Sequence, residues 1–352
     1  MNALSRRRLM TTAAATPLLT FARRASAQER SALIEGAKRE GKMSMATSVS
    51  QATFPRFMQA FTSLYPFLDV NSGYYSAPTG RVLARVEAEM RGGALSFDVL
   101  HVAAMAPYLT YARDGKLLPY RSPELAAYPP DAADPQGNWT TARVIGVIMA
   151  YNKNTLAPEK APRSWADALK PEFAGRKLIL QDAAAGTAFA QMYELEHHLG
   201  ADYLKRLAVQ KPLVVSTSAQ LIDLLVRGEA PIGFTVDHYR AFEPDAVKAG
   251  IVGIYPAEGM PIALAPIAVF RDAPHRNAAK LFVDFVLSHD GQKLLNYDIF
   301  GVYSLRPDVP SPAGQLPLAD TKPLLPSKAE LPEYEHALTT FPERFEALFQ
   351  SS

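Results

Sequence analysis

The chain has 352 residues, of which 48% are hydrophobic and 20% are charged, and its formal net charge is +2. This length is long for one domain and comfortable for two, and the composition is that of a globular protein with a sizeable core. The sequence contains no cysteine, which excludes a disulfide framework, a thiolate nucleophile and a cysteine-based metal site.

The N-terminus has the pattern of a removable export signal. Arg6–Arg8 precede an uncharged stretch of 12 residues, Thr11–Ala22, and Ala25–Ala27 then form an A-x-A cleavage pattern. The paired arginines favour the twin-arginine route, which exports folded proteins in bacteria. A membrane span needs roughly 20 apolar residues, so this stretch is too short to be an anchor. We expect residues 1–27 to be removed and the mature protein to reside in the periplasm.

The basic character of the chain comes mostly from this signal. Residues 1–27 hold five arginines and no acidic residue, so the mature chain has 32 basic and 35 acidic residues and a formal net charge of −3. It has no basic arm, no aromatic-basic interleaving and no zinc-ligand spacing. We therefore expect no nucleic-acid partner.

The first part of the mature chain alternates between helices and strands. The apolar spacing predicts helices over residues 30–41, 54–64, 79–91 and 105–113, and strands over residues 42–46, 68–72 and 97–102. Such alternation predicts an α/β fold with a mostly parallel sheet that helices cover on both faces. The polar loop 47–51 follows the first strand, and open α/β sheets bind ligands at the C-terminal ends of their strands.

Two uninterrupted apolar runs predict where the chain crosses between two lobes. Val144–Tyr151 leads out of the first lobe, and Pro261–Phe270 leads back. Two crossings imply a double-strand hinge. The expected lobes are residues 28–143 with 264–310, and residues 144–263, while a proline-rich segment and a last helix at 311–352 pack on the outside.

The second lobe has its own series of strands, loops and helices. Short helices are expected at 165–169 and 199–209, a helix follows the hydroxyl cluster Ser216–Ser218, and strands are expected at 213–215 and 231–236. The last of these strands delivers Asp237, His238 and Tyr239 to its end. We expect the neighbouring pair His197 and His198 to be solvated on an exposed helix.

The stretch Lys177–Tyr193 combines a strand, a small-residue loop and a helix. A helix that opens after such a loop directs free backbone N–H groups and the positive end of its dipole at whatever lies in front, which suits an oxyanion. The alternative is that Thr187 or Asp182 only caps the helix of an ordinary α/β unit.

Three segments, in consistent order, resemble the bacterial extracellular solute-binding proteins. Pro162–Lys177 is similar to their P-x-(S/T)-W-x-D-L…(F/Y)-x-G-K segment, Gly228–Ile232 to their G-E-x-x-(I/A) strand entry, and Ala279–Gln292 to their A-x-x-F-x-x-F-x-x-S-x-x-G-Q helix. The branch that looks most similar is the ferric-iron-binding type of periplasmic protein. The resemblance implies the two-lobed type II periplasmic-binding-protein fold, closing by hinge motion on a small ligand for an ABC permease in the inner membrane. It also implies a monomer.

The resemblance does not extend to the iron ligands. That branch holds its metal with two adjacent tyrosines after the G-E strand, and the same offset here holds His238 and Tyr239. Loop 47–51 offers neither the histidine nor the acidic ligand that the branch often places there. Ferric ion prefers hard anionic oxygens, so no cofactor is expected, and Fe³⁺ held by His238 and Tyr239 remains the alternative.

The loops and strand ends supply the candidate ligand-binding residues. The resemblance matches Ala185-Gly186-Thr187 to the branch's loop for an accompanying anion. An organic carboxylate, a phosphonate-like compound or an iron–anion chelate would suit these groups, although loop serines are usually solvated or cap helices. The candidates are Ser48, Ser50, Ser76, Thr79, Gly186, Thr187, Ser216, Asp237, His238 and Tyr239.

Two other classes of function remain as alternatives. A hydrolase is disfavoured because the chain has no G-x-S-x-G, no H-E-x-x-H and no phosphate loop. A triad of Asp237, His238 and a serine from 216–218 is disfavoured because adjacent strand residues face opposite sides. A ligand sensor that docks on a membrane receptor cannot be distinguished from a transport component by sequence.

Overall fold

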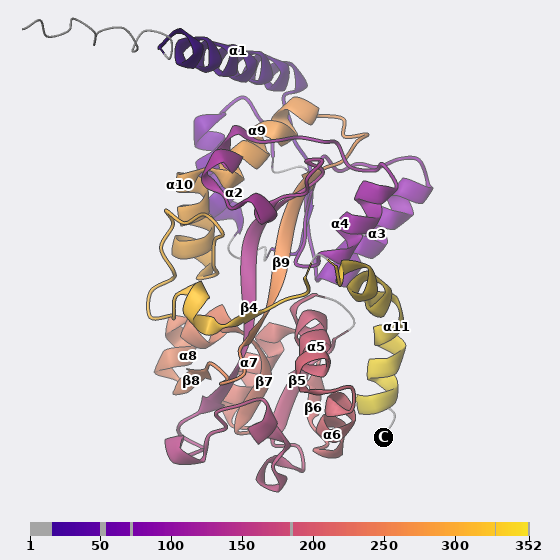
Figure 1. Cartoon of the computed structure of the whole chain (residues 1–352), viewed down its shortest axis with the longest axis vertical. Helices are drawn as coiled ribbons and strands as arrows, with labels where there is room; N and C mark the ends of the chain where they lie inside the picture. The colour runs from indigo at the N-terminus through magenta and orange to yellow at the C-terminus, as the bar shows by residue number, and fades with distance from the viewer. Residues whose placement is uncertain (1–15, 50–53, 71–72, 184–185, 328, 351–352) are drawn as a thin grey trace, which may run out of the picture.

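The computed structural model describes residues 16–49, 54–70, 73–183, 186–327 and 329–350, with side chains from residue 28 onward. Figure 1 shows an elongated α/β molecule in which two groups of strands and helices lie one above the other. No helix in these ranges is long and apolar enough to cross a membrane.

The described strands form one ten-stranded sheet in the order β2-β1-β3-β9-β4-β7-β5-β6, with β8 paired to β4 and β10 paired to β9. In each group three strands are parallel to one another, β2-β1-β3 in the first and β7-β5-β6 in the second. The strands are β1 (Met45–Thr47), β2 (Tyr74–Ser76), β3 (Val99–His101), β4 (Thr140–Asn152), β5 (Leu178–Gln181), β6 (Leu213–Val215), β7 (Ile232–Asp237), β8 (Ile251–Ile254), β9 (Met260–Val269) and β10 (Pro323–Leu324).

Strands β4 and β9 are long and antiparallel, and they join the two groups. The segment Thr140–Gly146 of β4 pairs with β9, and Val147–Asn152 pairs with β7 and β8. All 13 residues of β4 are buried, as expected for a strand without polar alternation. The predicted α/β fold with a central sheet between helices is confirmed, whereas the exact lobe boundaries remain a prediction.

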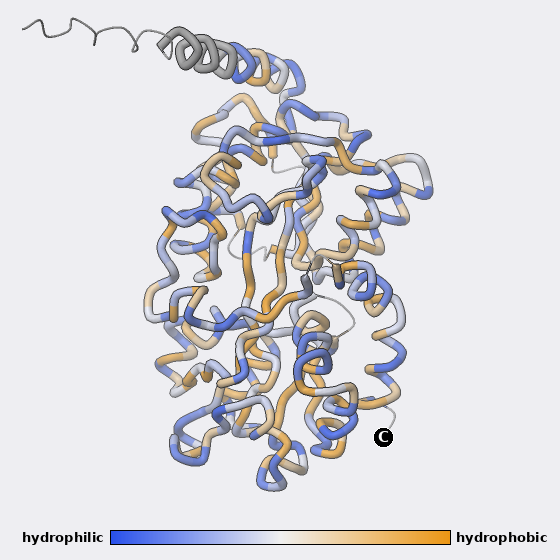
Figure 2. The backbone as a smooth tube through the Cα atoms, viewed as in Figure 1, coloured by the Kyte–Doolittle hydropathy of each residue, from blue (hydrophilic) through white to orange (hydrophobic). Residues whose placement is uncertain are grey.

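The helices bury apolar stripes against this sheet and against one another. In α2 the side chains of Phe57 and Phe61 are buried, and their rings lie 5.0 Å from Phe285 and 5.1 Å from Phe282 of α9. Figure 2 shows hydrophobic residues along the central strands and on the inner sides of the helices. The helices are α1 (Thr16–Glu40), α2 (Phe54–Leu64), α3 (Thr79–Arg91), α4 (Ala106–Arg113), α5 (Gly186–Leu199), α6 (Tyr203–Val209), α7 (Ser218–Arg227), α8 (Pro244–Lys248), α9 (Arg276–Leu287), α10 (His289–Gln292) and α11 (Leu331–Phe349).

Short helical turns fill several connections. The predicted helix over 165–169 is one of these, a 3-10 helix rather than an α-helix. A π-helical segment spans Lys293–Phe300. The 3-10 helices are Pro123–Ala127, Pro130–Ala132, Pro158–Lys160, Ala166–Leu169, Pro171–Phe173, His238–Phe242 and Leu318–Thr321.

The second predicted strand was placed too early. Within the described residues of 68–72 only Asp69 pairs, in an isolated bridge with Lys42, and the strand that joins β1 is Tyr74–Ser76. Gly73 lies just before it, and a Cβ atom there would be only 2.7 Å from the Cα atom of Ser44. The pairing of β2 with β1 therefore begins only after the point at which the backbone of Gly73 passes close to that of Ser44.

Helix α1 begins earlier than the predicted 30–41 and runs continuously past the predicted cleavage position. Figure 1 shows its first turns extending away from the body. Its last residue, Glu40, accepts hydrogen bonds from the backbone N–H groups of Asn277 and Ala278 at the start of α9. Removal of residues 1–27 stays a prediction.

Candidate functional site

A cavity of about 700 Å³ lies between the two groups of strands. Its lining comes from the C-terminal ends of all six parallel strands and from the two crossing residues Arg143 and Ile145 of β4. This is the position at which open α/β sheets bind ligands. The lining from these strand ends and loops includes Ser48, Ser76–Arg81, Ala103, Gln181, Asp182, Gly186, Thr187, Ser216–Ala219, Asp237, Tyr239 and Arg240.

The N-termini of three helices meet at this cavity. The first residues of α3, Thr79–Arg81, of α5, Gly186 and Thr187, and of α7, Ser218 and Ala219, all line it. Each N-terminus carries free N–H groups and a partial positive charge. The convergence of three such ends makes the cavity favourable for an anion.

Arg143 adds a buried cation to the cavity wall. The residue is 5% exposed, and its Nη2 has no hydrogen-bond partner among the described residues. Burial lowers the pKa of its guanidinium, and of the nearby groups that oppose this decrease, Tyr239, Tyr108, Asp237 and Tyr74, only one is a carboxylate. Burial raises the pKa of Tyr239 and that of Tyr74 to about 12, so both stay neutral near pH 7. The guanidinium therefore has donor capacity and charge left for a ligand.

The cavity is also lined by Asp237, which is 8% exposed. Burial raises the pKa of this carboxyl, while the hydroxyls of Thr187 and Ser218 and the charges of Arg240 and Arg143 oppose the increase. Its Oδ1 atom has no hydrogen-bond partner among the described residues. Asp237 can therefore accept a hydrogen bond from a hydroxyl of a bound molecule.

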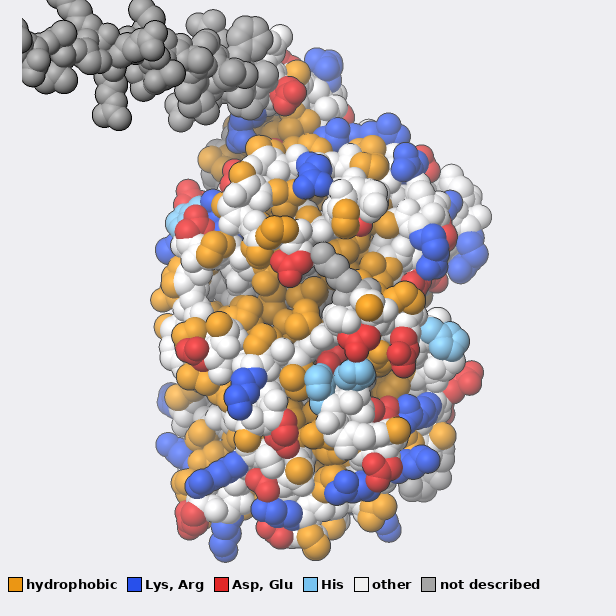
Figure 3. Space-filling view, viewed as in Figure 1, with side chains coloured by type: hydrophobic (Ala, Val, Ile, Leu, Met, Phe, Trp, Pro, Cys, Tyr) orange, Lys and Arg blue, Asp and Glu red, His pale blue; other side chains and the backbone are white. Residues whose placement is uncertain are grey.

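Unlike Arg143, Arg240 forms an ion pair with a carboxylate. Its Nη1 lies 3.0 Å from Oε1 of Glu243. Its guanidinium also lies over the ring of Tyr239, 5.1 Å from the centroid. Figure 3 shows basic and acidic side chains interspersed on the visible face and apolar side chains gathered near its middle.

The structure brings eight of the ten predicted site residues to this one cavity. Ser76 Oγ donates to the carbonyl of Val49 (2.5 Å), and Ser48 Oγ accepts from the N–H of Ala103 (3.1 Å), so these two hydroxyls already have partners. Ser50 lies outside the described residues. The eight are Ser48, Ser76, Thr79, Gly186, Thr187, Ser216, Asp237 and Tyr239.

His238 is the predicted residue that the structure places elsewhere. It is fully buried and does not line the cavity. Its Nδ1 lies 3.0 Å from the backbone nitrogen and 3.1 Å from the carbonyl oxygen of Gly146, and its ring stacks on Tyr303 with centroids 4.6 Å apart. Burial lowers its pKa to about 3. Because Tyr239 lines the cavity and His238 does not, the two do not converge on it as a pair of metal ligands.

Gly186, at the start of α5, lies close to residues of the first group of strands across the cavity. Its φ angle is 75°, and a Cβ atom there would be 3.6 Å from the carbonyl oxygen of Ala103 and 3.8 Å from Oγ1 of Thr79. A residue with a side chain would be strained by this backbone conformation alone. Substitution of Gly186 is therefore a poor test of binding.

The sequence reasoning missed the arginines of the cavity, above all Arg143. One signal could have found it, because Arg143 is the only charged residue in the 13-residue strand Thr140–Asn152. A charge in a strand buried along its whole length needs a partner or a function.

Comparison with known proteins shows the family of this chain. Residues 101–321 match the model of the bacterial extracellular solute-binding proteins. The chain belongs to this family. An uncharacterized protein of Haemophilus influenzae is 26% identical over 270 residues, which cover 73% of this chain and 76% of that protein.

Solved structures of periplasmic binding proteins share the fold. The substrate-binding protein of an ABC transporter from Agrobacterium tumefaciens has a TM-score of 0.77 at 17% identity, covering 88% of this chain and 96% of that one. AfuA from Actinobacillus pleuropneumoniae, with exogenous fructose-6-phosphate bound, has a TM-score of 0.76 at 21% identity (89% and 99%). Iron-bound HitA from Pseudomonas aeruginosa has a TM-score of 0.74 at 19% identity (86% and 99%). These likenesses confirm the type II periplasmic-binding-protein fold and the expected similarity to the ferric-binding branch.

Proposed function

We propose that this solute-binding protein is the periplasmic component of an ABC importer and captures a small anionic ligand in the cavity between its two lobes. The observation that carries the proposal is Arg143, a buried guanidinium with an unpartnered nitrogen in the cavity wall. A buried cation without a full counter-charge is costly. A bound anion would supply the missing charge and hydrogen bonds.

The three helix N-termini support the same ligand class. Because α3, α5 and α7 each direct backbone N–H groups at the cavity, an oxyanion there would be met from both groups of strands. A carboxylate, a phosphonate-like group or an iron–anion chelate fits these donors. The acceptor Asp237 favours a ligand that also carries a hydroxyl.

Bare ferric ion is less well supported by the cavity. His238 is buried away from it, which leaves Tyr239 and two aspartates, Asp182 and Asp237, against three arginines. A site rich in cations repels an unaccompanied trivalent metal. Among the described residues, no three His, Cys, Asp or Glu side chains are grouped so that they could hold a metal.

The remaining features of the proposal follow from the sequence. Export by the twin-arginine route would deliver the folded monomer to the periplasm, and the lobes would be residues 28–143 with 264–310, and residues 144–263. A permease in the inner membrane would then accept the ligand. A sensor that presents the same ligand to a membrane receptor would use the same cavity.

Native mass spectrometry of the protein purified from its own periplasm tests the proposal. We expect an added mass that corresponds to a small organic anion or its metal chelate. Thermal-shift screening should then show stabilisation by anions and none by Fe³⁺ alone, because binding to the folded state raises the melting temperature. Recovery of a cationic or purely apolar ligand would contradict the proposal, as would turnover of the bound molecule.

A further inference from the structure

His101 is a fully buried residue that contacts the cavity arginine. It ends strand β3, and Arg143 Nε donates a hydrogen bond to its Nε2 (3.1 Å). In the sheet His101 is opposite Ile267 of β9, and Arg143 is opposite Ala265 two residues earlier. Residues two apart on a strand share a face, so the pair meets over one face of β9. Ala265, with its single methyl group, leaves room for the long arginine side chain.

The hydrogen bond fixes the chemical state of the imidazole. Arginine can only donate, so Nε2 must be the unprotonated nitrogen, and the proton lies on Nδ1. Nδ1 has no partner among the described residues. Burial, and then the charge of Arg143, hold the pKa of His101 well below 6.5, so the imidazole stays neutral.

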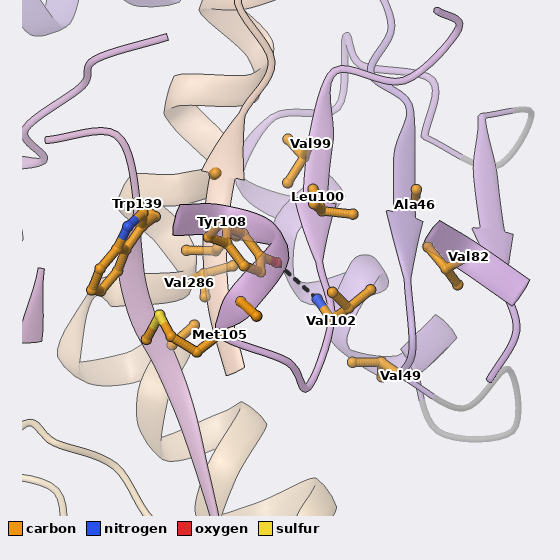
Figure 4. Packing of buried hydrophobic residues seen from close by; sticks show 14 of the residues in the cluster. Ala46, Val49, Val82, Val99, Leu100, Val102, Met105, Tyr108, Trp139 and Val286 are labelled. Atoms are coloured by element: carbon orange, nitrogen blue, oxygen red, sulfur yellow. Dashed lines mark hydrogen bonds between the residues drawn. The ribbon is translucent and has the colours of Figure 1, made fainter. Parts of the chain in front are cut away.

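The surrounding backbone holds His101 in place. Its carbonyl accepts hydrogen bonds from Oγ1 of Thr47 (2.8 Å) and from the N–H of Ser48 (3.1 Å). The next N–H, that of Val102, donates to the hydroxyl of Tyr108 (2.9 Å), which in turn donates to the carbonyl of Pro266 (2.7 Å). Figure 4 shows the Tyr108 side chain directed at Val102. The backbone around His101 is therefore held by contacts with β1, α4 and β9, and the ring itself is bonded to Arg143 of β4.

We propose that His101 is a positioning residue that orients the Arg143 guanidinium toward the ligand without neutralising its charge. Buried arginines are usually held by carboxylates, which fix the geometry but also cancel the charge. A neutral imidazole accepts the same Nε–H hydrogen bond and leaves the positive charge for the anion. The inference rests on the proposed function, because it assigns His101 a role only in binding an anion.

Three substitutions of His101 distinguish the effect of losing the hydrogen-bond acceptor from the effect of adding a negative charge. In His101→Gln the amide oxygen is a neutral acceptor at about the reach of Nε2, so anion affinity should stay within about threefold of the parent. In His101→Leu the acceptor is lost, and in His101→Glu the acceptor is charged and pairs with Arg143. Both should weaken binding by about tenfold or more, as expected for loss of one charge-assisted hydrogen bond or of the free charge.

The binding probe is whichever of inorganic phosphate, citrate and glucose-6-phosphate stabilises the parent protein most, and titration calorimetry measures its affinity. Equal affinity of the Glu and Gln variants would overturn the role of His101 and leave the anion-binding proposal intact. If the parent binds none of the three anions, both proposals are wrong.

Nitrogen-15 NMR tests the pair without any ligand. The parent should show a slowly exchanging Arg143 Nε–H signal and an imidazole protonated on Nδ1. The Arg143 signal should persist in His101→Gln and be lost in His101→Leu, while circular dichroism confirms that both variants fold. An imidazole protonated on Nε2, or an Arg143 signal unchanged in His101→Leu, would overturn the inference.

Discussion

At the scale of single residues, two arginines of the same cavity offer a matched comparison. Each has one buried nitrogen without a hydrogen-bond partner among the described residues, Nη2 of Arg143 and Nε of Arg240, but only Arg240 forms an ion pair, with Glu243. We predict that Arg143→Gln weakens anion binding tenfold to a hundredfold, because a charge-assisted hydrogen bond contributes about 1.5–3 kcal/mol. Arg240→Gln should weaken it only a few-fold, since that charge is already compensated.

Titration calorimetry at two salt concentrations distinguishes these outcomes. The parent and Arg240→Gln should lose affinity as salt rises, and Arg143→Gln should show the weakest dependence if its charge dominates. Equal losses in both variants would mean that the cavity acts through its overall potential and not through Arg143.

The predicted residues that line the cavity share one property, their position at or soon after the C-terminal end of a strand. Asp237 and Tyr239 were proposed from the end of one such strand, and Thr187 from the loop and helix that follow another. His238 was included for its position between them, but successive side chains at a strand end face opposite sides. Arg143 was missed because its partner His101 is 42 residues away, and no local pattern joins them.

At the scale of elements, helix α5 connects the cavity to the C-terminal helix. Its first residues line the cavity, and Phe189 packs on Tyr334 and Phe341 of α11 with ring centroids 5.0 and 5.2 Å away. His197 and His198 are exposed, as expected. Each also faces a glutamate, because their Nε2 atoms lie 3.1 Å from Glu330 and 3.2 Å from Glu194.

The buried carboxyl of Glu194 makes the free energy of unfolding depend on pH. Its side chain is 1% exposed, and burial, then the charge of Glu330, raise its pKa from 4.5 to about 7. The folded state therefore holds a proton that the unfolded state releases near pH 4.5. The free energy of unfolding that this group contributes is fully present below that pH and is lost as pH rises through about 7.

We predict that Glu194→Gln abolishes the decrease in stability that Glu194 causes as pH rises. Relative to the variant, the parent should become less stable by about 2 kcal/mol between pH 4.5 and 8, from a shift worth 1.36 kcal/mol per pKa unit with allowance for screening. Urea unfolding across this range measures the difference. The neighbouring side chains His197, His198 and Glu330 are the same in both proteins. Parallel curves for the two proteins would contradict the prediction.

Elements with strong periodicity were predictable, and those that depend on tertiary pairing were not. Helix α3 has the predicted bounds, 79–91, because its apolar stripe sets them. Strand β8 (Ile251–Ile254) was missed because its pairing with β4 is decided by the fold and its own sequence is short. The start of β2 likewise depends on the contact of Gly73 with Ser44.

At the scale of the whole molecule, three elements, β4, β9 and α11, join the two groups of strands. Strands β4 and β9 connect them through the sheet. On the outside, α11 pairs Glu335 with Arg113 of α4 (2.9 Å) and Arg344 with Glu196 of α5. Figure 1 shows α11 beginning just below α4 and running down beside the second group. If the two groups move relative to each other, each of these two ion pairs either follows the movement or breaks.

Small-angle X-ray scattering of the ligand-free protein, titrated with the anion recovered by native mass spectrometry, tests the central claim most directly. If the anion is captured between two hinged lobes through Arg143, the radius of gyration should decrease in the parent as sites fill, and stay constant in Arg143→Gln at the same concentration. A profile that is unchanged in the parent at saturation, or that compacts equally in Arg143→Gln, would contradict the account.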